Sequence, residues 1–295
     1  MTTAVSGPPT TRAFRRTPAE QARQIAAEIL KYASLVFAAL CVIIPLLVFV
    51  FLSLKTNAKT NTTSPLSPPR SLDLHNYSVA FTQAKMTLAF TNTLIIMIFS
   101  ISMTVIIGSM TAYAIDRFQF RGKRLVLGAF LVGSLVPTIT TQVATFQVVK
   151  YFGLVGTLRA PIVLYLGTDI ISIYIFLQFI RSIPISLDES ARLEGASTFR
   201  IYRTIIFPLL RPAVATVVII KAVAIYNDFY TPFLYLSGNP RLAVVSTALF
   251  TFKGPFGTQY NVLSAAALLI ILPVLVLFLF LQKYIYNGFS NGAIK

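Results

Sequence analysis

The sequence is short of the residues on which most soluble enzymes depend. It has one cysteine and one histidine among 295 residues, and only 12% of its residues are charged, with nine acidic side chains. A globular domain of this length carries about a quarter charged residues. The single cysteine, Cys41, excludes a disulfide within the chain and a cysteine-based metal site, and the single histidine, His75, leaves little room for histidine-dependent catalysis. These absences exclude an ordinary soluble protein.

What the sequence has instead is long apolar segments, with 56% hydrophobic residues and a mean hydropathy of +0.75. A helix that crosses the hydrocarbon core of a bilayer needs about 17 to 25 mostly apolar residues. Six segments meet this requirement: Tyr32–Leu54, Leu88–Ile115, Leu125–Val149, Ala160–Ile180, Pro208–Leu236 and Val262–Tyr284. The sequence therefore predicts an all-α polytopic membrane protein with six transmembrane helices. We place an N-terminal tail at 1–31, a transmembrane domain at 32–286 and a C-terminal tail at 287–295.

The first apolar segment is longer than the apolar region of a signal peptide, which has about 7 to 15 residues. It also leads into a polar stretch that contains Lys55 and Lys59 rather than into a small-residue cleavage site. We therefore interpret it as an uncleaved first span.

The 25 basic residues indicate the orientation of the spans. With a cytoplasmic N-terminus, the inner segments hold about twice as many Lys and Arg as the outer ones, which agrees with the positive-inside rule. Both termini are therefore expected in the cytoplasm. The formal charge of +16 could also indicate nucleic-acid binding. Because the basic residues are spread over several loops and tails instead of one soluble face, membrane topology explains them better.

The inner stretch 182–212 between the fourth and fifth spans is too polar for lipid and has helix signals of its own. Ser186 followed three residues later by Glu189 is typical of a capping box, so a short helix is expected to begin there. Gly195 permits a tight end to that helix, and Ser197 is placed to cap a second one. These residues suit either a docking site for another protein or a helix that lies among lipid headgroups.

The same stretch carries a recognisable motif. Glu189–Gly195, with Ile205 and Pro208 after it, resembles the E-A-A, three residues, G, nine residues, I-x-L-P motif of ATP-binding-cassette importer permeases. Ser190, Glu194 and Phe207 depart from that motif, the first two by small or conservative changes. Further matches to the sugar branch, in particular to the second permease of maltose-type systems, are Asn92–Leu94, Ala112–Phe118, Phe120–Gly122, Gly153–Thr157, Asn227–Phe229 with Pro232, and Asn287–Lys295.

The resemblance implies a permease subunit of an ATP-driven, binding-protein-dependent sugar importer in the bacterial plasma membrane. It implies three partners: a homologous second permease, a cytoplasmic ATPase dimer that binds ATP and Mg, and an extracytoplasmic solute-binding protein. This chain would bind no cofactor, and the sequence indeed has no G-x-x-x-x-G-K-[ST] phosphate loop. The residues implied to couple to the ATPase are Ser186, Glu189, Ser190, Ala191, Glu194, Gly195, Ala196 and Pro208. A C-terminal contact with the ATPase would involve Ser290, Asn291 and Gly292.

Ionisable side chains inside spans are costly and usually face a cavity or a partner. Asp169, Lys221 and Asp228 are of this kind, and Lys221 and Asp228 are about two helical turns apart. Because neutral sugars are held by planar polar groups and aromatic rings, we expect a solute pathway near Asp169, Tyr174, Lys221, Tyr226, Asn227, Asp228 and Tyr230. Four of these residues also have a structural interpretation. Asn227 and Asp228 match the family pattern at the outer end of their span, Asp169 suits the outer membrane interface, and Lys221 suits an ion pair or a position that reaches the headgroups.

Other functions remain to be weighed. A permease of the same superfamily for a non-sugar solute fits the motif equally well. An ion-coupled carrier would leave the motif unexplained, and we see no inverted repeat of the kind such carriers often show. A membrane-embedded enzyme would need a convergent nucleophile, base or metal site that this sequence does not offer.

Overall fold

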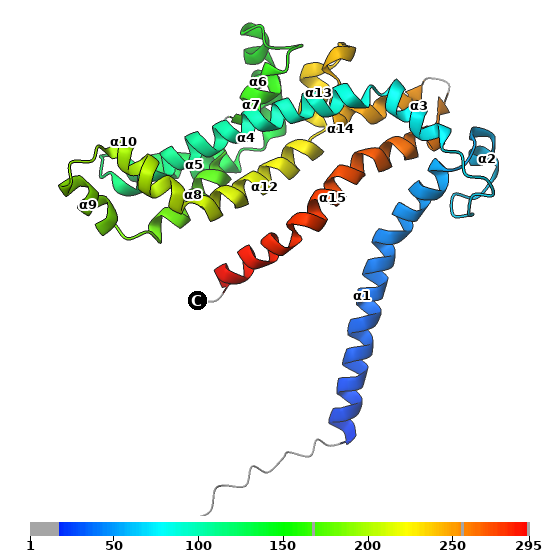
Figure 1. Ribbon diagram of the computed structural model, residues 1–295, viewed down its shortest axis with the longest axis horizontal. Coiled ribbons are helices and arrows are strands. Elements are labelled where there is room, and N and C mark those ends of the chain that lie inside the picture. The colour runs from blue at the N-terminus through cyan, green and yellow to red at the C-terminus, as the bar shows by residue number, and fades with distance from the viewer. Residues whose placement is uncertain (1–17, 167–168, 255–256, 294–295) are drawn as a thin grey trace, which may run out of the picture.

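A computed structural model describes residues 18–166, 169–254 and 257–293. Helices form nearly all of its regular structure (Figure 1). The longer elements are α1 (Pro18–Ser53), α4 (Met86–Arg117), α5 (Lys123–Leu135), α6 (Thr138–Tyr151), α7 (Arg159–Leu166), α8 (Ile170–Arg181), α12 (Arg211–Asn227) and α15 (Tyr260–Ala293). The shorter ones are α2 (Asn57–Thr62), α3 (His75–Gln83), α9 (Ser186–Leu193), α10 (Thr198–Ile201), η1 (Tyr202–Ile206), α11 (Phe207–Leu209), α13 (Tyr230–Leu236), η2 (Pro240–Leu242), α14 (Val245–Ala248) and η3 (Leu249–Phe252). Two-residue strands β1 (Lys253–Gly254) and β2 (Gly257–Thr258) pair antiparallel.

Three of the six predicted spans are continuous helices. The stretches Arg23–Ser53, Met86–Arg117 and Tyr260–Leu279 are each long and apolar enough to cross a membrane. The first of these stretches is part of a longer helix, because α1 begins at Pro18. The all-α polytopic fold predicted from the sequence is confirmed.

The other three predicted spans are bent pairs of helices, a feature that the apolar segments did not reveal. The third is broken by 104° between α5 and α6, where Pro137 cannot continue the hydrogen bonds of a helix. The fourth bends by 44° between α7 and α8. The fifth begins with a 72° bend between Leu209 and Arg211 and ends at Asn227, so that Leu236 belongs to the separate helix α13.

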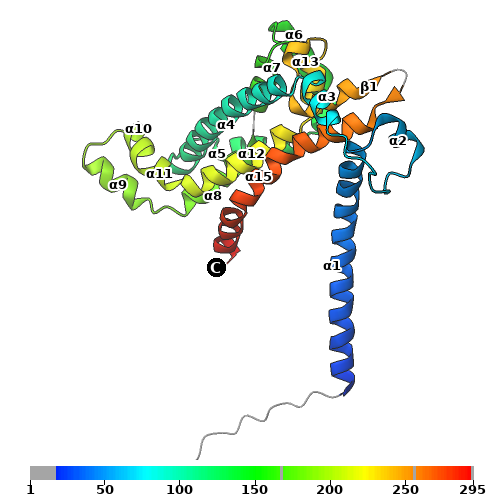
Figure 2. The ribbon, with the colours of Figure 1, turned by 45° about the vertical axis from the view of Figure 1, so that its right-hand side comes forward.

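The short elements lie mainly at two opposite ends of the molecule. α3 contacts both α4 and α15 and shares a core cluster with the first residues of each, and the small hairpin lies at this same end. α9 and α10 lie at the opposite end, beyond the C-terminal end of α4 (Figures 1 and 2). The loop between α1 and α4 contains the short helix α3, whose Asn76 is buried against the end of α1 and against Asn261.

Helix α4 is the centre of the main core. It packs against α7, α8 and α12, and fourteen of its residues are buried. A Cβ added at Gly108 of α4 would lie 3.3 Å from the ring of Phe176 on α8, so the absence of a side chain there permits the close approach of the two helices. The helix whose C-terminal end lies next to α9 and α10 is therefore deeply packed.

Helix α1 differs from the other spans because it leaves the body of the molecule, as both views show (Figure 2). Its side chains are exposed from Arg23 through Leu47, and only its C-terminal end is partly buried. Ser53 at that end shares a hydrogen bond of 2.8 Å with the hydroxyl of Tyr77 on α3.

Candidate functional site

The predicted docking segment forms a helix–turn–helix unit at one end of the molecule. Ile185 is the N-cap residue of α9, and no side chain hydrogen-bonds to this end of the helix. The expected capping box of Ser186 and Glu189 was therefore wrong. Ser186 is the first helical residue rather than the cap. The buried residues of α9 are Asp188 and Ala191, three apart on one face, whereas Leu187 is exposed.

The turn after α9 follows the sequence prediction more closely. Gly195 has a φ of +82°, a left-handed conformation that glycine adopts without strain. The Ser197 hydroxyl accepts a hydrogen bond of 3.3 Å from the backbone N–H of Arg200, which confirms its role as the cap of α10. The chain then remains helical through η1 and α11 as far as Leu209.

The outer surface of this unit combines apolar and acidic side chains. Leu193 is 90% exposed and Phe199 is 60% exposed, and Ile185 and Leu187 add to the apolar surface. Among the residues that the resemblance implies to couple, Ser186, Glu189, Ser190, Glu194 and Gly195 are exposed, Ala196 and Pro208 are partly buried, and Ala191 is buried. Large apolar side chains exposed among polar ones are typical of a surface that contacts another protein or a membrane.

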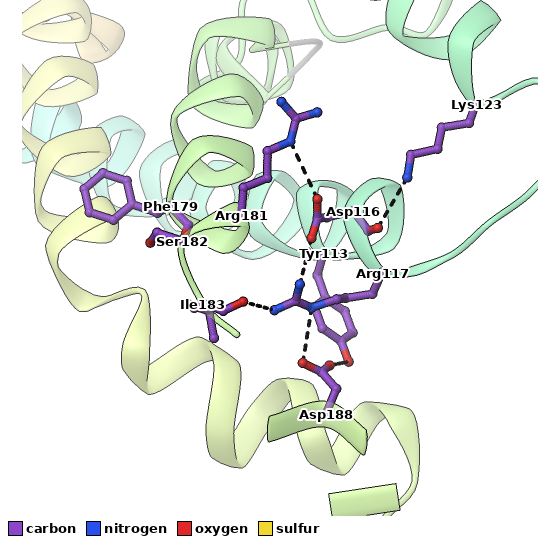
Figure 3. Close-up of polar contacts among 9 residues, drawn as sticks. All are labelled: Tyr113, Asp116, Arg117, Lys123, Phe179, Arg181, Ser182, Ile183 and Asp188. Carbon is purple, nitrogen blue, oxygen red and sulfur yellow. Dashed lines mark hydrogen bonds and ion pairs between the residues drawn. The ribbon is translucent and has the colours of Figure 1, made fainter. Parts of the chain in front are cut away.

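Beneath α9 lies a buried polar network that sequence reasoning missed (Figure 3). Tyr113 on α4 donates a hydrogen bond of 2.7 Å to one carboxylate oxygen of Asp188. Nε of Arg117 lies 3.1 Å from the other oxygen, and the side chains of Arg117 and Asp188 are each only 3% exposed. Nη2 of Arg117 also donates a bond of 2.8 Å to the backbone carbonyl of Ile183.

The network continues outward through Asp116, which neighbours Arg117 in the sequence. Nη1 of Arg117 lies 2.9 Å from Asp116, and Nε of Arg181 lies 3.6 Å from the same carboxylate. The ammonium group of Lys123 donates to the carbonyl oxygen of Asp116 at 3.3 Å (Figure 3). Arg117 is therefore surrounded by two carboxylates and a carbonyl, which compensate for the desolvation of its charge.

A second ionic contact lies within the spans. Nζ of Lys221 on α12 lies 3.1 Å from a carboxylate oxygen of Asp169 at the start of α8, and their side chains are 16% and 14% exposed. Ser172 donates a hydrogen bond to the same carboxylate. Two of the predicted solute-pathway residues are thus brought together.

The remaining predicted pathway residues do not converge on this pair. Asp228 accepts a bond of 2.8 Å from Tyr165 and another of 3.2 Å from the backbone N–H of Thr231, so it holds the junction between α12 and α13. Tyr226 donates to the carbonyl of Ile270 and Asn227 to that of Val223 within its own helix. Tyr174 reaches the carbonyl of Leu127 at 3.4 Å, and Tyr230 is exposed.

Ser290, Asn291 and Gly292 lie in the last turns of α15, and their side chains fall outside the part of the structure that is described. Across the described residues, no group of three or more His, Cys, Asp or Glu side chains could hold a metal ion.

Comparison with known proteins identifies the family of the chain. Residues 104–291 match the family described as binding-protein-dependent transport system inner membrane component. The chain belongs to this family. The permease is therefore a multi-pass membrane transport component rather than an enzyme, and the resemblance seen in the sequence is confirmed.

Named relatives match along most of the permease. It is 34% identical over 251 residues to the melibiose/raffinose/stachyose import permease protein MelC of Bacillus subtilis, a match that covers 84% of this chain and 90% of the relative. It is 34% identical over 238 residues to the probable starch degradation products transport system permease protein AmyC of Thermoanaerobacterium thermosulfurigenes, covering 79% and 85%. The diacetylchitobiose uptake system permease protein NgcG of Streptomyces coelicolor is 27% identical over 282 residues, covering 95% and 92%.

A solved structure shares the fold. A chain in the crystal structure of a bacterial ABC transporter involved in the import of the acidic polysaccharide alginate superposes with a TM-score of 0.77 at 19% identity. The match covers 91% of the permease and 98% of that chain.

Two signals in the sequence point to the buried network in retrospect. Tyr113 and Arg117 are four residues apart and so share a helix face, and Asp116 and Arg117 end a long apolar span. The sequence could not reveal that Asp188, rather than its neighbour Glu189, turns inward.

Proposed function

We propose that the permease is the membrane subunit of an ATP-driven carbohydrate importer and forms half of its translocation pathway. The observation that carries this proposal is the exposed α9–α10 unit on a chain of the binding-protein-dependent transport family. The carbohydrate assignment is supported by the relatives, whose names specify oligosaccharides of several kinds.

In this proposal, α9 is the coupling helix that docks on a separate ATPase. The exposed residues Leu193 and Phe199 provide apolar contact area, and Glu189 and Glu194 provide charge for basic partners. Pro208 ends the unit and marks the start of the next span. ATP and Mg would be bound by the ATPase, since this chain has no phosphate-binding loop.

The proposal includes a homologous second permease and an extracytoplasmic solute-binding protein. Six spans of one chain supply only part of a closed pathway, and the exposed side chains of α1 are available to neighbouring chains or lipid. The further contact of Ser290, Asn291 and Gly292 with the ATPase remains a prediction.

We propose that both termini and α9 lie in the cytoplasm. The basic residues favour this orientation. It is also supported by the position of α9 at the end of α4 remote from α3, and by the run of α15 away from α3 toward its C-terminus.

For the solute pathway, we propose that Asp169 and Lys221 take part. Their charges lie within spans, their side chains retain some exposure, and Ser172 is the further partner of the pair among the described residues. A hydroxyl-rich solute could replace either ion as a hydrogen-bond partner of the other. Tyr174, Tyr226, Asn227, Asp228 and Tyr230 are held by other contacts or lie apart, and they are weaker candidates.

The test is reconstitution of the permease with its partner permease, ATPase and binding protein in vesicles, followed by measurement of ATP hydrolysis and labelled-oligosaccharide uptake. The decisive variant is Gly195→Asp. It adds a charged side chain where nothing lies within 4 Å of a new Cβ, so it strains the left-handed turn and obstructs the docking surface without a clash inside the chain.

The matched control is Gly153→Asp, because Gly153 also has a positive φ, of +66°, and open space around its Cβ. We expect Gly195→Asp to abolish uptake and Gly153→Asp to retain it. Uptake that persists without any ATPase and follows an ion gradient would contradict the proposal and favour a secondary carrier. Uptake of a non-sugar solute alone would overturn only the carbohydrate assignment.

A further inference from the structure

Helix α4 holds the coupling segment at three separate places. Arg117 binds the carbonyl of Ile183 before α9, and Tyr113 and Arg117 bind Asp188 within α9. One turn further back, the hydroxyls of Ser109 on α4 and Tyr202 on η1 share a hydrogen bond of 2.7 Å. Ser109, Tyr113 and Arg117 are spaced by four residues and so form one stripe along the helix.

The N-terminal part of α4 is also held by specific hydrogen bonds. The side-chain amide of Asn92 donates to the carbonyls of Arg241 and Ala243 at 3.0 and 2.9 Å, and Thr93 accepts from the backbone N–H of Val245 at 3.1 Å. These contacts bind α4 to the segment that contains η2 and the start of α14. That segment lies at the opposite end of the molecule from α9 (Figure 1).

Between these two attachments α4 is an uninterrupted helix. It contains no proline and spans 32 residues, or about 48 Å at 1.5 Å per residue. α9 itself touches the rest of the molecule mainly through one face, because Asp188 and Ala191 are its buried residues. α9 is therefore joined to α4 by side-chain contacts, in addition to its chain connections to α8 and α10, so a displacement of α9 acts on α4 directly.

We propose that α4 is a transmission rod between the two faces of the permease, and that Arg117, Asp188 and Tyr113 form its inner joint while Asn92 forms its outer joint. This inference rests on the proposed docking of α9 to an ATPase. The four are positioning residues: they touch neither ATP nor solute, and they make the motion of α9 and that of the 240–248 segment a single motion.

The test is the ratio of ATP hydrolysis with loaded binding protein to hydrolysis without it, in the complete reconstituted complex. A defect in folding or assembly lowers both rates together and leaves this ratio unchanged. A broken joint leaves basal hydrolysis intact and lowers the ratio, because the signal from the outer face no longer reaches the ATPase.

We expect Asp188→Asn and Asn92→Ala each to lower the ratio by at least about fivefold, the smaller end of typical coupling effects. Because both joints lie on one path, the double variant should be no worse than the more severe single one. Matched controls are Asp73→Asn and Asn57→Ala, which change the same residue types in the loop and short helix after α1. A smaller fall in either joint variant, or a fall in the controls as large as in the joint variants, would overturn the proposal.

Should Asp188→Asn fail to assemble, Tyr113→Phe decides, because it removes a single hydroxyl from the inner joint. A loss of about twofold or more in the ratio is expected from the missing hydrogen bond, and a smaller loss would overturn the proposal. The wild-type complex distinguishes a wrong role for α4 from a wrong proposed function. If the wild type shows no stimulation and no ATP-dependent uptake, the ATPase coupling itself is wrong; if it shows both and the variants match it, only the rod is wrong.

Discussion

Two of the ionic contacts between helices of the permease are built differently. The Arg117–Asp188 pair is 3% exposed on both sides and has three further partners, in Tyr113, Asp116 and the carbonyl of Ile183. The Lys221–Asp169 pair is 16% and 14% exposed, and Ser172 is its further partner among the described residues. The first pair is enclosed by several partners, and the second is partly exposed and has fewer.

The difference follows from the physical chemistry of buried charge. A charged pair without water needs other groups to occupy its remaining donors and acceptors, and the loss of one partner leaves an uncompensated charge. The planar guanidinium group of Arg117 meets most of this requirement, because Nη1 and Nη2 donate hydrogen bonds while Nε lies within ion-pair distance of Asp188. The ammonium of Lys221, by contrast, is a compact charge on a flexible stem. The proposed attachment of α9 to α4 and the proposed solute contact thus use different cations.

The strongest challenge to this comparison is Asp188→Ala, which leaves Arg117 buried without its inner carboxylate. We expect a loss of about 3–5 kcal/mol in the free energy of unfolding. Denaturation of the purified chain in detergent, followed by circular dichroism, measures it. The double variant Asp188→Leu with Arg117→Met removes both charges and should recover most of the loss. Equal stability of the single variant and the wild type would contradict the description of the pair as fixed.

Lys221→Met tests the looser pair. Because the side chains of this pair are partly exposed, we expect a smaller loss of about 1–2 kcal/mol. Uptake should fall further than this stability loss explains, if the pair faces the solute. The measurement is labelled-oligosaccharide uptake normalised to assembled complex, with Lys150→Met, an exposed lysine at the end of α6, as the control. Normal uptake would remove Lys221 from the pathway.

Ser109→Ala probes the third attachment of α4, where it removes the hydrogen bond to Tyr202. The expected loss is about 1 kcal/mol, the net value of a typical hydrogen bond. The same denaturation experiment measures it. Ser134→Ala is a suitable control, since that exposed serine bonds within its own helix. A loss as large as that of Asp188→Ala would mean that packing around Tyr202, and not the ion pair, carries the joint.

Arg181→Gln should have the smallest effect. This side chain is 58% exposed and lies 3.6 Å from Asp116, so solvent screens the contact, and we expect a loss of less than about 0.5 kcal/mol. The denaturation experiment again measures it. A larger loss would show that the contact of Arg181 with Asp116 supports the Arg117–Asp188 pair. The stabilities of buried and exposed contacts would then differ less than we expect.

The sequence predicted the number and approximate position of the apolar spans well, because hydropathy depends on composition over about twenty residues. It did not predict the 104° break near Pro137 or the separation of α13 from α12. Those breaks arise from single residues and from neighbours that satisfy the exposed backbone groups. A hydropathy average over about twenty residues reveals neither the single residues nor the neighbouring groups.

The docking unit was predicted in part. Gly195 and Ser197 signal their roles through local backbone chemistry, and both were confirmed. The capping box failed because Ile185 is the N-cap residue of α9 and its carbonyl accepts from the backbone N–H groups of Asp188 and Glu189, so Ser186 is already inside the first turn. Asp188 there binds Tyr113, a residue 75 positions earlier in the chain.

The sequence by itself determined that this chain crosses a membrane several times and presents an importer-type coupling motif, since both depend on residue types at short spacing. Only the tertiary structure decided which acid of the pair Asp188 and Glu189 faces inward, that Lys221 pairs with Asp169 rather than with Asp228, and that one helix connects both faces. Each of these depends on the approach of segments far apart in the chain, and local spacing carries no information about that approach.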